Sequence, residues 1–308
     1  MSVTAIGFIG LFALFALLFL RVPVAMAMLT VGFVGTTAIN GYTAALSALG
    51  TETLEISVTL TLTVIPLFVL MGNLAGVSGM SRDLFNAAYC WVGHWRGGLA
   101  SATIAGCAGF AALSGSSIAS AITMGRVALP EMKRFKYDDS LATGAVAAGG
   151  TLGILIPPST GLIIYAILTE QSIGRLFMAG IIPGILLTCL FLLAISIITR
   201  IKPELGPVGP ESTFLVKIKS LKKASTMMII VVATIGGIYM GVFTPVEAAG
   251  VGAMLAFGVA LYRKSLDRDK LSFVILQTLQ TTATVFMILI GAHVFIPFMA
   301  LTHIPADM

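Results

Sequence analysis

Long apolar runs separated by short polar connections dominate this chain. A membrane-spanning helix needs about 20 mostly apolar residues, because each residue adds about 1.5 Å to a path of about 30 Å. By that measure the pattern predicts spanning helices at 3–20, 22–39, 57–79, 141–168, 176–199, 226–243, 246–262 and 273–301. The chain is therefore predicted to be an all-α polytopic membrane protein.

One further apolar segment, 98–128, has a polar interruption in its middle. It is long enough to cross a bilayer once, but the run LSGSS at 113–117 is rich in residues that weaken a helix. Two interpretations are open at this point. The segment is either a single crossing or the two short arms of a re-entrant hairpin.

The distribution of basic residues separates these two interpretations, because cytoplasmic loops collect Lys and Arg. With a hairpin, seventeen of the eighteen Lys and Arg residues share one side and only Arg175 faces the other. With a single crossing, the division becomes fourteen against four. The hairpin is favoured, opening from the cytoplasm, with a periplasmic N-terminus.

The apolar segment 141–168 contains no charged residue, yet two prolines and a cluster of glycines interrupt it. Proline removes a backbone donor and clashes with the preceding turn. A break in lipid persists only where protein or water satisfies the freed backbone groups, and secondary transporters bind ions and anionic substrates at such breaks. The pattern predicts a broken helix at a binding site, with a simple proline kink as the alternative.

Two helix junctions repeat the same plan. Pro23-Val24 and Pro245-Val246 lie 222 residues apart and, in the favoured topology, on opposite sides of the membrane. This arrangement predicts the inverted repeats of secondary transporters. The predicted division is a first repeat at 1–200 (scaffold helices within 3–79), a cytoplasmic linker at 201–224 and the start of a second repeat at 225–308. A second hairpin is expected near position 320, so we expect the chain to be truncated before it.

Composition supports the membrane interpretation and excludes several other classes of protein. The chain is 57% hydrophobic and 10% charged, whereas soluble domains carry about 25% charged residues. Its net charge of +5 is spread over short connections and is not typical of a nucleic-acid patch. The three cysteines, Cys90, Cys107 and Cys189, lie far apart and predict neither a disulfide nor a metal site.

Four sequence runs resemble the large membrane subunit (M subunit) of tripartite ATP-independent periplasmic (TRAP) transporters, which belong to the ion transporter superfamily. These runs are FAALSGSSIASAITMGRVALPEM (110–132), GAVAAGGTLGILIPPST (144–160), SIGRLFMAGIIPGILL (172–187) and GGIYMGVFTPVEAAGVGA (236–253). The resemblance implies a sodium-driven importer of organic acids in the bacterial inner membrane, not an enzyme. It also implies an elevator-type fold, a small four-helix membrane subunit and a periplasmic substrate-binding protein.

The predicted sodium site combines the hairpin tip with the broken helix. Hydroxyl and carbonyl oxygens suit a hard monovalent cation, whereas proton relays in membranes use buried Asp, Glu or His, which 98–125 and 141–168 lack. Together with the resemblance, this predicts sodium ligands at Ser114, Gly115, Ser116, Ser117, Gly150, Thr151 and Gly153. Packing of small residues between helices is the alternative. No cofactor other than Na⁺ as coupling ion is expected.

The predicted substrate site lies where two helices begin, because a helix N-terminus attracts a carboxylate. The resemblance implies a dicarboxylate, a sialic acid or a sugar acid as substrate. The candidate residues are Ser117, Pro157, Pro158, Ser159 and Thr160. In the alternative interpretation, the prolines only set a bend and Ser159 satisfies its own backbone.

Other functions are weighed against transport. An intramembrane serine hydrolase would pair Ser116 or Ser117 with His293 as the base. A passive channel would need a polar pore-lining face, which no predicted helix shows. A structural partner subunit is a third possibility. The lysines of 217–223 are expected to meet anionic phospholipid at the cytoplasmic surface.

Overall fold

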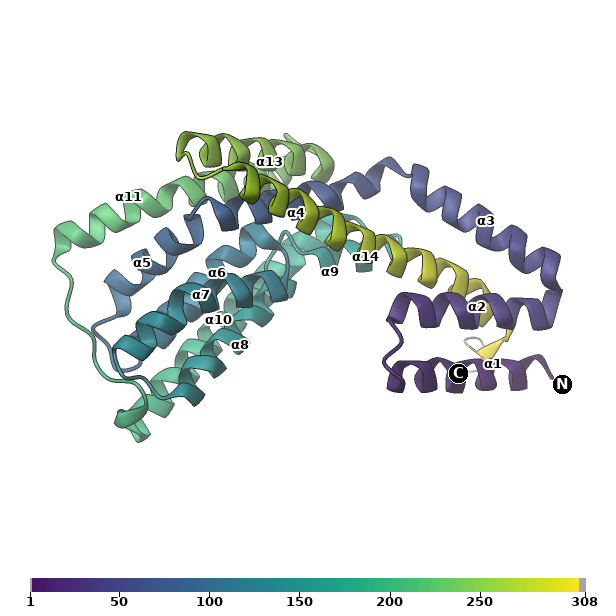
Figure 1. Ribbon diagram of the computed structural model, residues 1–308, viewed down its shortest axis with the longest axis horizontal. Helices are drawn as coiled ribbons and strands as arrows, with labels where there is room; N and C mark the ends of the chain where they lie inside the picture. The colour runs from purple at the N-terminus through teal and green to yellow at the C-terminus, as the bar shows by residue number, and fades with distance from the viewer. Residues whose placement is uncertain (1, 305–308) are drawn as a thin grey trace. The chain divides into compact units, whose positions relative to one another are not determined.

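The computed structural model describes residues 2–304, and within them every regular element is a helix. The chain divides into two compact units, which are described separately. The first contains the chain up to Thr63 and the chain from Leu279 onward, and the second is Val64–Thr278. Figure 1 shows the helices of both. The all-helical prediction is confirmed for the described residues.

In the first unit, two helices pack closely against one buried aromatic side chain of a third. Its elements are α1 (Val3–Phe19), α2 (Val24–Asn40), α3 (Tyr42–Val58), the 3₁₀ turn η1 (Leu60–Thr63) and the end of α14 (Arg268–Leu301). Phe298 of α14 is fully buried, and β-carbons added at Gly10 or Gly35 would lie 2.7 Å and 2.2 Å from its ring. The two glycines therefore let α1 and α2 approach this ring closely.

The second unit carries both interrupted segments. Its elements are α4 (Val64–Val77), α5 (Met80–Val92), α6 (Gly98–Ser114), α7 (Ser117–Arg134), α8 (Asp139–Leu155), α9 (Thr160–Leu168), α10 (Ile173–Ile201), η2 (Pro203–Leu205), α11 (Phe214–Val231), the π-helical η3 (Val232–Gly236), α12 (Gly237–Tyr239), α13 (Pro245–Tyr262) and the start of α14. Figure 1 shows α6, α7, α8 and α10 side by side, and α13 packs against α4.

The helix lengths agree in part with the predicted spans. Six helices of the described residues are long and apolar enough to cross a membrane: Leu60–Val77, Asp139–Leu168 (counted across its break), Ile173–Ile201, Phe214–Tyr239, Pro245–Tyr262 and Arg268–Leu301. The predicted spans 3–20 and 22–39 correspond to apolar helices of 17 residues each. The predicted polytopic membrane class is supported, and the eight crossings stay a prediction.

The structure differs from the sequence prediction at three places. The predicted span 57–79 corresponds to the shorter helical stretch Leu60–Val77, because α3 ends at Val58 and the η1 turn leads directly into α4. Helix α3 itself was missed because Glu52 and Glu55 interrupt its apolar pattern. The predicted linker 201–224 contains η2 and the start of α11 at Phe214, and its role as the connection between two repeats stays a prediction.

Residues 205–209 of the predicted linker bind the base of the α6–α7 hairpin, and we call these residues the linker clasp. Four hydrogen bonds join the clasp to its neighbours: Asp138 N to Leu205 O (3.1 Å), Gly97 N to Gly206 O (3.0 Å), Tyr137 Oη to Pro207 O (2.9 Å) and Gly209 N to Gly93 O (3.1 Å). A β-carbon at Gly206 would lie 2.8 Å from Thr199 of α10. This part of the linker is therefore packed into the second unit.

Candidate functional site

The interruption predicted at 113–117 forms the tip of a helical hairpin. Helix α6 ends at Ser114, and Gly115 caps it in the left-handed conformation, with φ of 59°. Such a φ favours glycine, which has no β-carbon to clash. The Ser116 side chain then accepts a hydrogen bond from Ala119 N and caps the start of α7. The hairpin itself is confirmed, and its re-entrant insertion stays a prediction.

The break predicted at Pro157-Pro158 separates α8 from α9. Helix α8 ends at Leu155, and Ser159 caps the start of α9 by accepting a hydrogen bond from Leu162 N. The Ser159 hydroxyl also donates to the Ile154 carbonyl across the break, and the residue is fully buried. Ser159 therefore satisfies backbone groups on both sides of the break, and its substrate role stays a prediction.

The hairpin tip and the break are joined by hydrogen bonds. The Gly115 carbonyl oxygen accepts one bond from Thr160 N (3.1 Å) and a second from Thr160 Oγ1 (2.9 Å). A β-carbon added at Gly115 would lie 2.6 Å from the Pro158 carbonyl oxygen. Both lone pairs of the Gly115 carbonyl are thus engaged, and this oxygen holds the tip against the start of α9.

A second contact joins the start of α7 to the last turn of α8. A β-carbon at Gly153 would lie 2.6 Å from the Ser116 carbonyl oxygen and 2.8 Å from Ser117 N. One at Gly150 would lie 2.7 Å from the β-carbon of Ala121. The two glycines therefore allow backbone to meet backbone. The structure brings together seven of the predicted site residues here and at the Gly115 contact: Gly115, Ser116, Ser117, Gly150, Gly153, Pro158 and Thr160.

The site collects four helix ends of two kinds. Helices α6 and α8 end here, at Ser114 and Leu155, and their last carbonyls carry partial negative charge that attracts a cation. Helices α7 and α9 begin here, at Ser117 and Thr160, and their first N–H groups attract an anion. Within residues 2–304 no cluster of His, Cys, Asp and Glu is arranged to bind a metal. The oxygens available at the contact are hydroxyls and carbonyls.

Two predicted sodium ligands lie outside these backbone contacts. The Ser114 hydroxyl is buried and lies 2.7 Å from the Ser120 hydroxyl within the hairpin. The Thr151 hydroxyl donates to the Ala148 carbonyl of its own helix at 2.6 Å, and the residue is exposed. Ser114 therefore stabilises the hairpin internally, while Thr151 presents an accessible oxygen beside the break.

Sequence reasoning missed the glycines that support the site from neighbouring helices. A β-carbon at Gly72 of α4 would lie 2.6 Å from the Ser114 α-carbon. On α10, one at Gly180 would lie 2.7 Å from the Leu155 carbonyl oxygen, and one at Gly184 2.7 Å from Ile156 Cγ1. The four-residue spacing of Gly180 and Gly184 is the small-residue pattern of close helix packing in membranes, and it was the available signal.

The long apolar helices, with a hairpin seated on a broken helix, define a polytopic helical membrane protein. Residues 11–308 match the family described as "Tripartite ATP-independent periplasmic transporter, DctM component". The chain belongs to this family, as its sequence motifs predicted. The match and the six long helices support a multi-pass protein of the inner membrane.

Relatives with curated names are permease proteins for several substrates. The C4-dicarboxylate TRAP transporter large permease protein DctM of Pseudomonas aeruginosa is 37% identical over 85% of this chain and 61% of its own length. The sialic acid TRAP transporter large permease protein SiaM of Vibrio cholerae is 37% identical over 76% of this chain and 55% of its own length. The ectoine/5-hydroxyectoine TRAP transporter large permease protein UehC of Ruegeria pomeroyi is 32% identical over 90% of this chain and 64% of its own length. The chain thus spans roughly half to two thirds of these relatives, which are named as permeases and not as hydrolases.

Proposed function

We propose that this chain belongs to the large permease of a TRAP importer that carries a small organic acid by sodium-coupled secondary transport. A periplasmic binding protein delivers the substrate, a small membrane subunit completes the permease, and the N-terminus is periplasmic. The contact between the hairpin tip and the broken helix carries this proposal. Two interrupted helices that satisfy each other's backbone, in apolar segments, are typical of transporter binding sites.

The ligands available at this contact support sodium as the proposed coupling ion. The ends of α6 and α8 supply partial negative charge, Ser116 and Ser117 at the start of α7 carry hydroxyls, and Thr151 carries one in α8 before the break. Hydroxyl and carbonyl oxygens coordinate hard cations, and Na⁺ needs no group that titrates. A proton-coupled site would need a carboxyl or imidazole group, and neither occurs in 98–125 or 141–168.

An anionic substrate suits the opposite helix ends. Helices α7 and α9 both begin at the contact, and the dipole of each helix favours negative charge there. Among the relatives, the printed names include C4-dicarboxylate, sialic acid and isethionate transporters. These three substrates are all small organic acids, so we propose a small organic acid as the substrate of this permease.

An elevator mechanism requires the binding site to move as part of one rigid body. Tight backbone contacts join α7 to α8 at the tip, and the linker clasp joins the hairpin base to α8 and α10. The hairpin, the broken helix and α10 are thus connected at both ends. This mutual packing supports their movement as one body.

The test is uptake of a labelled C4-dicarboxylate into proteoliposomes that hold the whole permease, its small subunit and its binding protein. An inward sodium gradient is compared with a proton gradient for the unmodified protein, Ser116→Ala and Thr151→Ala. We expect sodium-dependent uptake and a weaker apparent sodium affinity in both variants. Thr169→Ala is the control, because its hydroxyl also donates to a carbonyl of its own helix, at the far end of α9.

Three uptake results would contradict different parts of this proposal. Uptake driven by protons and indifferent to sodium would exclude sodium as the coupling ion. Equilibration without accumulation under any gradient would favour the passive channel. Sodium-dependent uptake with the same sodium affinity in all three variants would place the ion elsewhere in the permease.

A further inference from the structure

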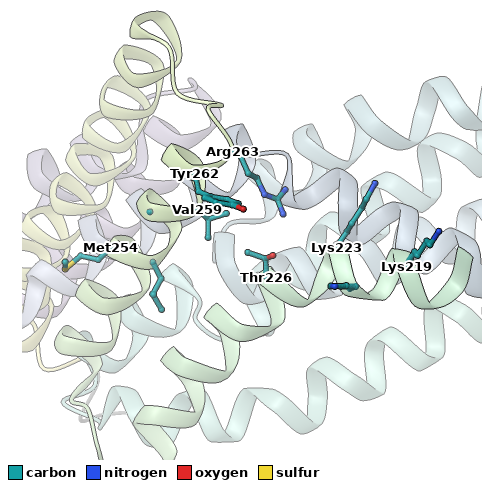
Figure 2. A pocket seen from close by; sticks show the side chains of 10 residues that line it. Lys219, Lys223, Thr226, Met254, Val259, Tyr262 and Arg263 are labelled. Atoms are coloured by element: carbon teal, nitrogen blue, oxygen red, sulfur yellow. The ribbon is translucent and has the colours of Figure 1, made fainter. Parts of the chain in front are cut away.

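A groove of about 680 Å³ lies between α11 and α13 in the second unit. Figure 2 shows Lys219, Lys223 and Thr226 on α11, across from Val259, Tyr262 and Arg263 at the end of α13. The groove is far from uniform, because its charged residues gather at one end. A groove with one basic end and one apolar end suits a ligand that has a negatively charged group and an apolar chain.

The basic end of the groove combines residues from both helices. Lys219, Lys223 and Thr226 are spaced by four and three residues, so they share one face of α11. Lys222 lines the groove as well. Arg263 is held by Asp83 through an ion pair of 2.6 Å. The three lysines have no carboxylate within ion-pair distance among residues 2–304, so their positive charge is available to a ligand.

The other end of the groove is apolar and open. Met254 and Leu255 line it and are 76% and 39% exposed. Gly258 lies between these residues and Arg263, and a β-carbon there would meet no atom within 4 Å. Met254 lies nine positions before Arg263, the C-cap of α13, so the apolar wall continues for about 13 Å beyond the basic end.

Aromatic residues indicate the depth of the basic end in the membrane. Trp91 and Trp95 are 45% and 57% exposed, and Trp residues gather where the bilayer meets water. The Lys217 ammonium lies 5.9 Å from the centre of the Trp91 ring, two residues before Lys219. The lysines of α11 therefore lie at the level of lipid headgroups, and the apolar end of the groove lies at the level of acyl chains.

We propose that this groove binds one anionic phospholipid. The phosphate pairs with the three lysines, and one acyl chain lies over Gly258 against Met254 and Leu255. A free phosphate ion would leave the apolar wall exposed, and a neutral phospholipid would leave the net positive charge of the lysines uncompensated. An anionic diacyl lipid satisfies both ends at once.

The test is lipid retention by the whole permease with its small subunit, measured by native mass spectrometry. Dioleoyl phosphatidylglycerol is compared with dioleoyl phosphatidylcholine, which has the same acyl chains. We expect a phosphatidylglycerol adduct that phosphatidylcholine does not replace. The triple variant K219Q/K222Q/K223Q should weaken this adduct on the order of 100-fold, at about fivefold per lysine.

Two further variants make the test specific. K133Q/K202Q/K264Q removes three positive charges from positions that do not line the groove, and it should retain the adduct. Gly258→Leu keeps every charge and fills the apolar end without a backbone clash, so it should lose the adduct at an unchanged unfolding midpoint.

Three results would overturn the proposal. Equal losses in the two triple variants would show diffuse attraction of anionic lipid to the whole surface. A retained adduct in Gly258→Leu would show that no acyl chain occupies the groove. Displacement of the lipid by glycerol 1-phosphate alone would show a site for the free phosphate ester.

Discussion

The two ends of the α6–α7 hairpin are held by opposite means. At the tip, Gly115 and Gly153 bring backbone against backbone, and a side chain at either position would clash with a carbonyl oxygen at 2.6 Å. At the base, a buried side chain makes the connection, because the Tyr137 hydroxyl accepts from Leu99 N and donates to the Pro207 carbonyl. The tip is held by close backbone contacts that only glycine permits, whereas the base is held by hydrogen bonds of the Tyr137 side chain.

This difference shows how a hairpin can be fixed while its binding site stays open. Small residues at the tip leave backbone carbonyls and hydroxyls near the break, where an ion or a carboxylate needs them. At the base no ligand is expected, so a bulky side chain can fill the space and satisfy the linker clasp. The four variants that follow break one end or the other, from the largest expected effect to the smallest.

Gly153→Val should have the largest effect, because its side chain would meet the Ser116 carbonyl oxygen. Overpacking of this kind costs about 3 kcal/mol where backbone cannot move away. We expect a lower thermal unfolding midpoint in detergent and no substrate uptake. Gly144→Val on the same helix is the control, since a β-carbon there meets nothing within 4 Å. Equal midpoints for the two variants would show that the tip is not tightly packed.

Tyr137→Phe tests the base of the hairpin. The change removes the hydroxyl that pairs with Leu99 N (3.2 Å) and with Pro207 O (2.9 Å), and Leu99 N is left buried without its partner. The expected loss of stability is about 2 kcal/mol, measured by denaturant unfolding. Tyr165→Phe, at a residue that is 57% exposed, should change stability little. If both variants unfold alike, the clasp contributes nothing to stability.

Thr160→Val removes one of the two hydrogen bonds to the Gly115 carbonyl and leaves the backbone bond intact. We expect a stability loss of about 1 kcal/mol and a higher apparent KM for substrate, because the tip is less firmly seated. Thr169→Val provides the comparison, as its hydroxyl bonds only within α9 and its turn. An unchanged KM with lowered stability would separate the tip contact from substrate binding.

Protonation of Asp138 should have the smallest effect. Hydrogen bonds from the Ser140 hydroxyl and then from its backbone N–H hold the pKa of Asp138 below its usual range, and they cap α8 beside the clasp. Because the folded-state pKa is lowered, this stabilisation is present above the usual pKa of an aspartate and is lost as pH falls through the lower, folded-state value.

Unfolding midpoints measured between about pH 7 and about pH 3 check this pH dependence. Asp138→Asn should flatten the low-pH part of the profile. Asp139→Asn, which removes the neighbouring carboxylate, is the matched control for the loss of one negative charge at the start of α8. If Asp138→Asn leaves the unfolding midpoints at low pH unaltered, other carboxylates cause the loss of stability in acid.

The residue types at 113–117 and 157–158 were enough to predict both helix interruptions from the sequence. The residues that contact these interruptions could be identified only from the structure. The LSGSS run and the Pro157-Pro158 pair mark helix ends within a residue or two of those observed. Proline alone is insufficient evidence, because α10 continues through Pro183 as one helix of 29 residues. Several glycines together with two prolines distinguish a true break from a tolerated proline.

The predicted linker illustrates what a sequence pattern misses. The clasp uses the backbone carbonyls of Leu205, Gly206 and Pro207, and any residue can supply a carbonyl. Its proline-rich and glycine-rich composition predicted only a connection. Helix α5 was missed for a related reason, since its 13 residues mix charged and apolar positions and are too short to be detected as a span.

The sequence by itself determined the helical membrane class, the family and the positions of both breaks. These properties follow from residue chemistry, because lipid demands long apolar runs while Gly and Pro alter the backbone wherever they occur. Only the tertiary structure decided that Gly115 meets Thr160, 45 residues further along the chain, and that the Thr151 hydroxyl bonds within its own helix and stays exposed. The hydrogen-bond partner of a carbonyl or a hydroxyl depends on how the helices pack. That packing results from many weak side-chain and backbone contacts, which no local sequence pattern records.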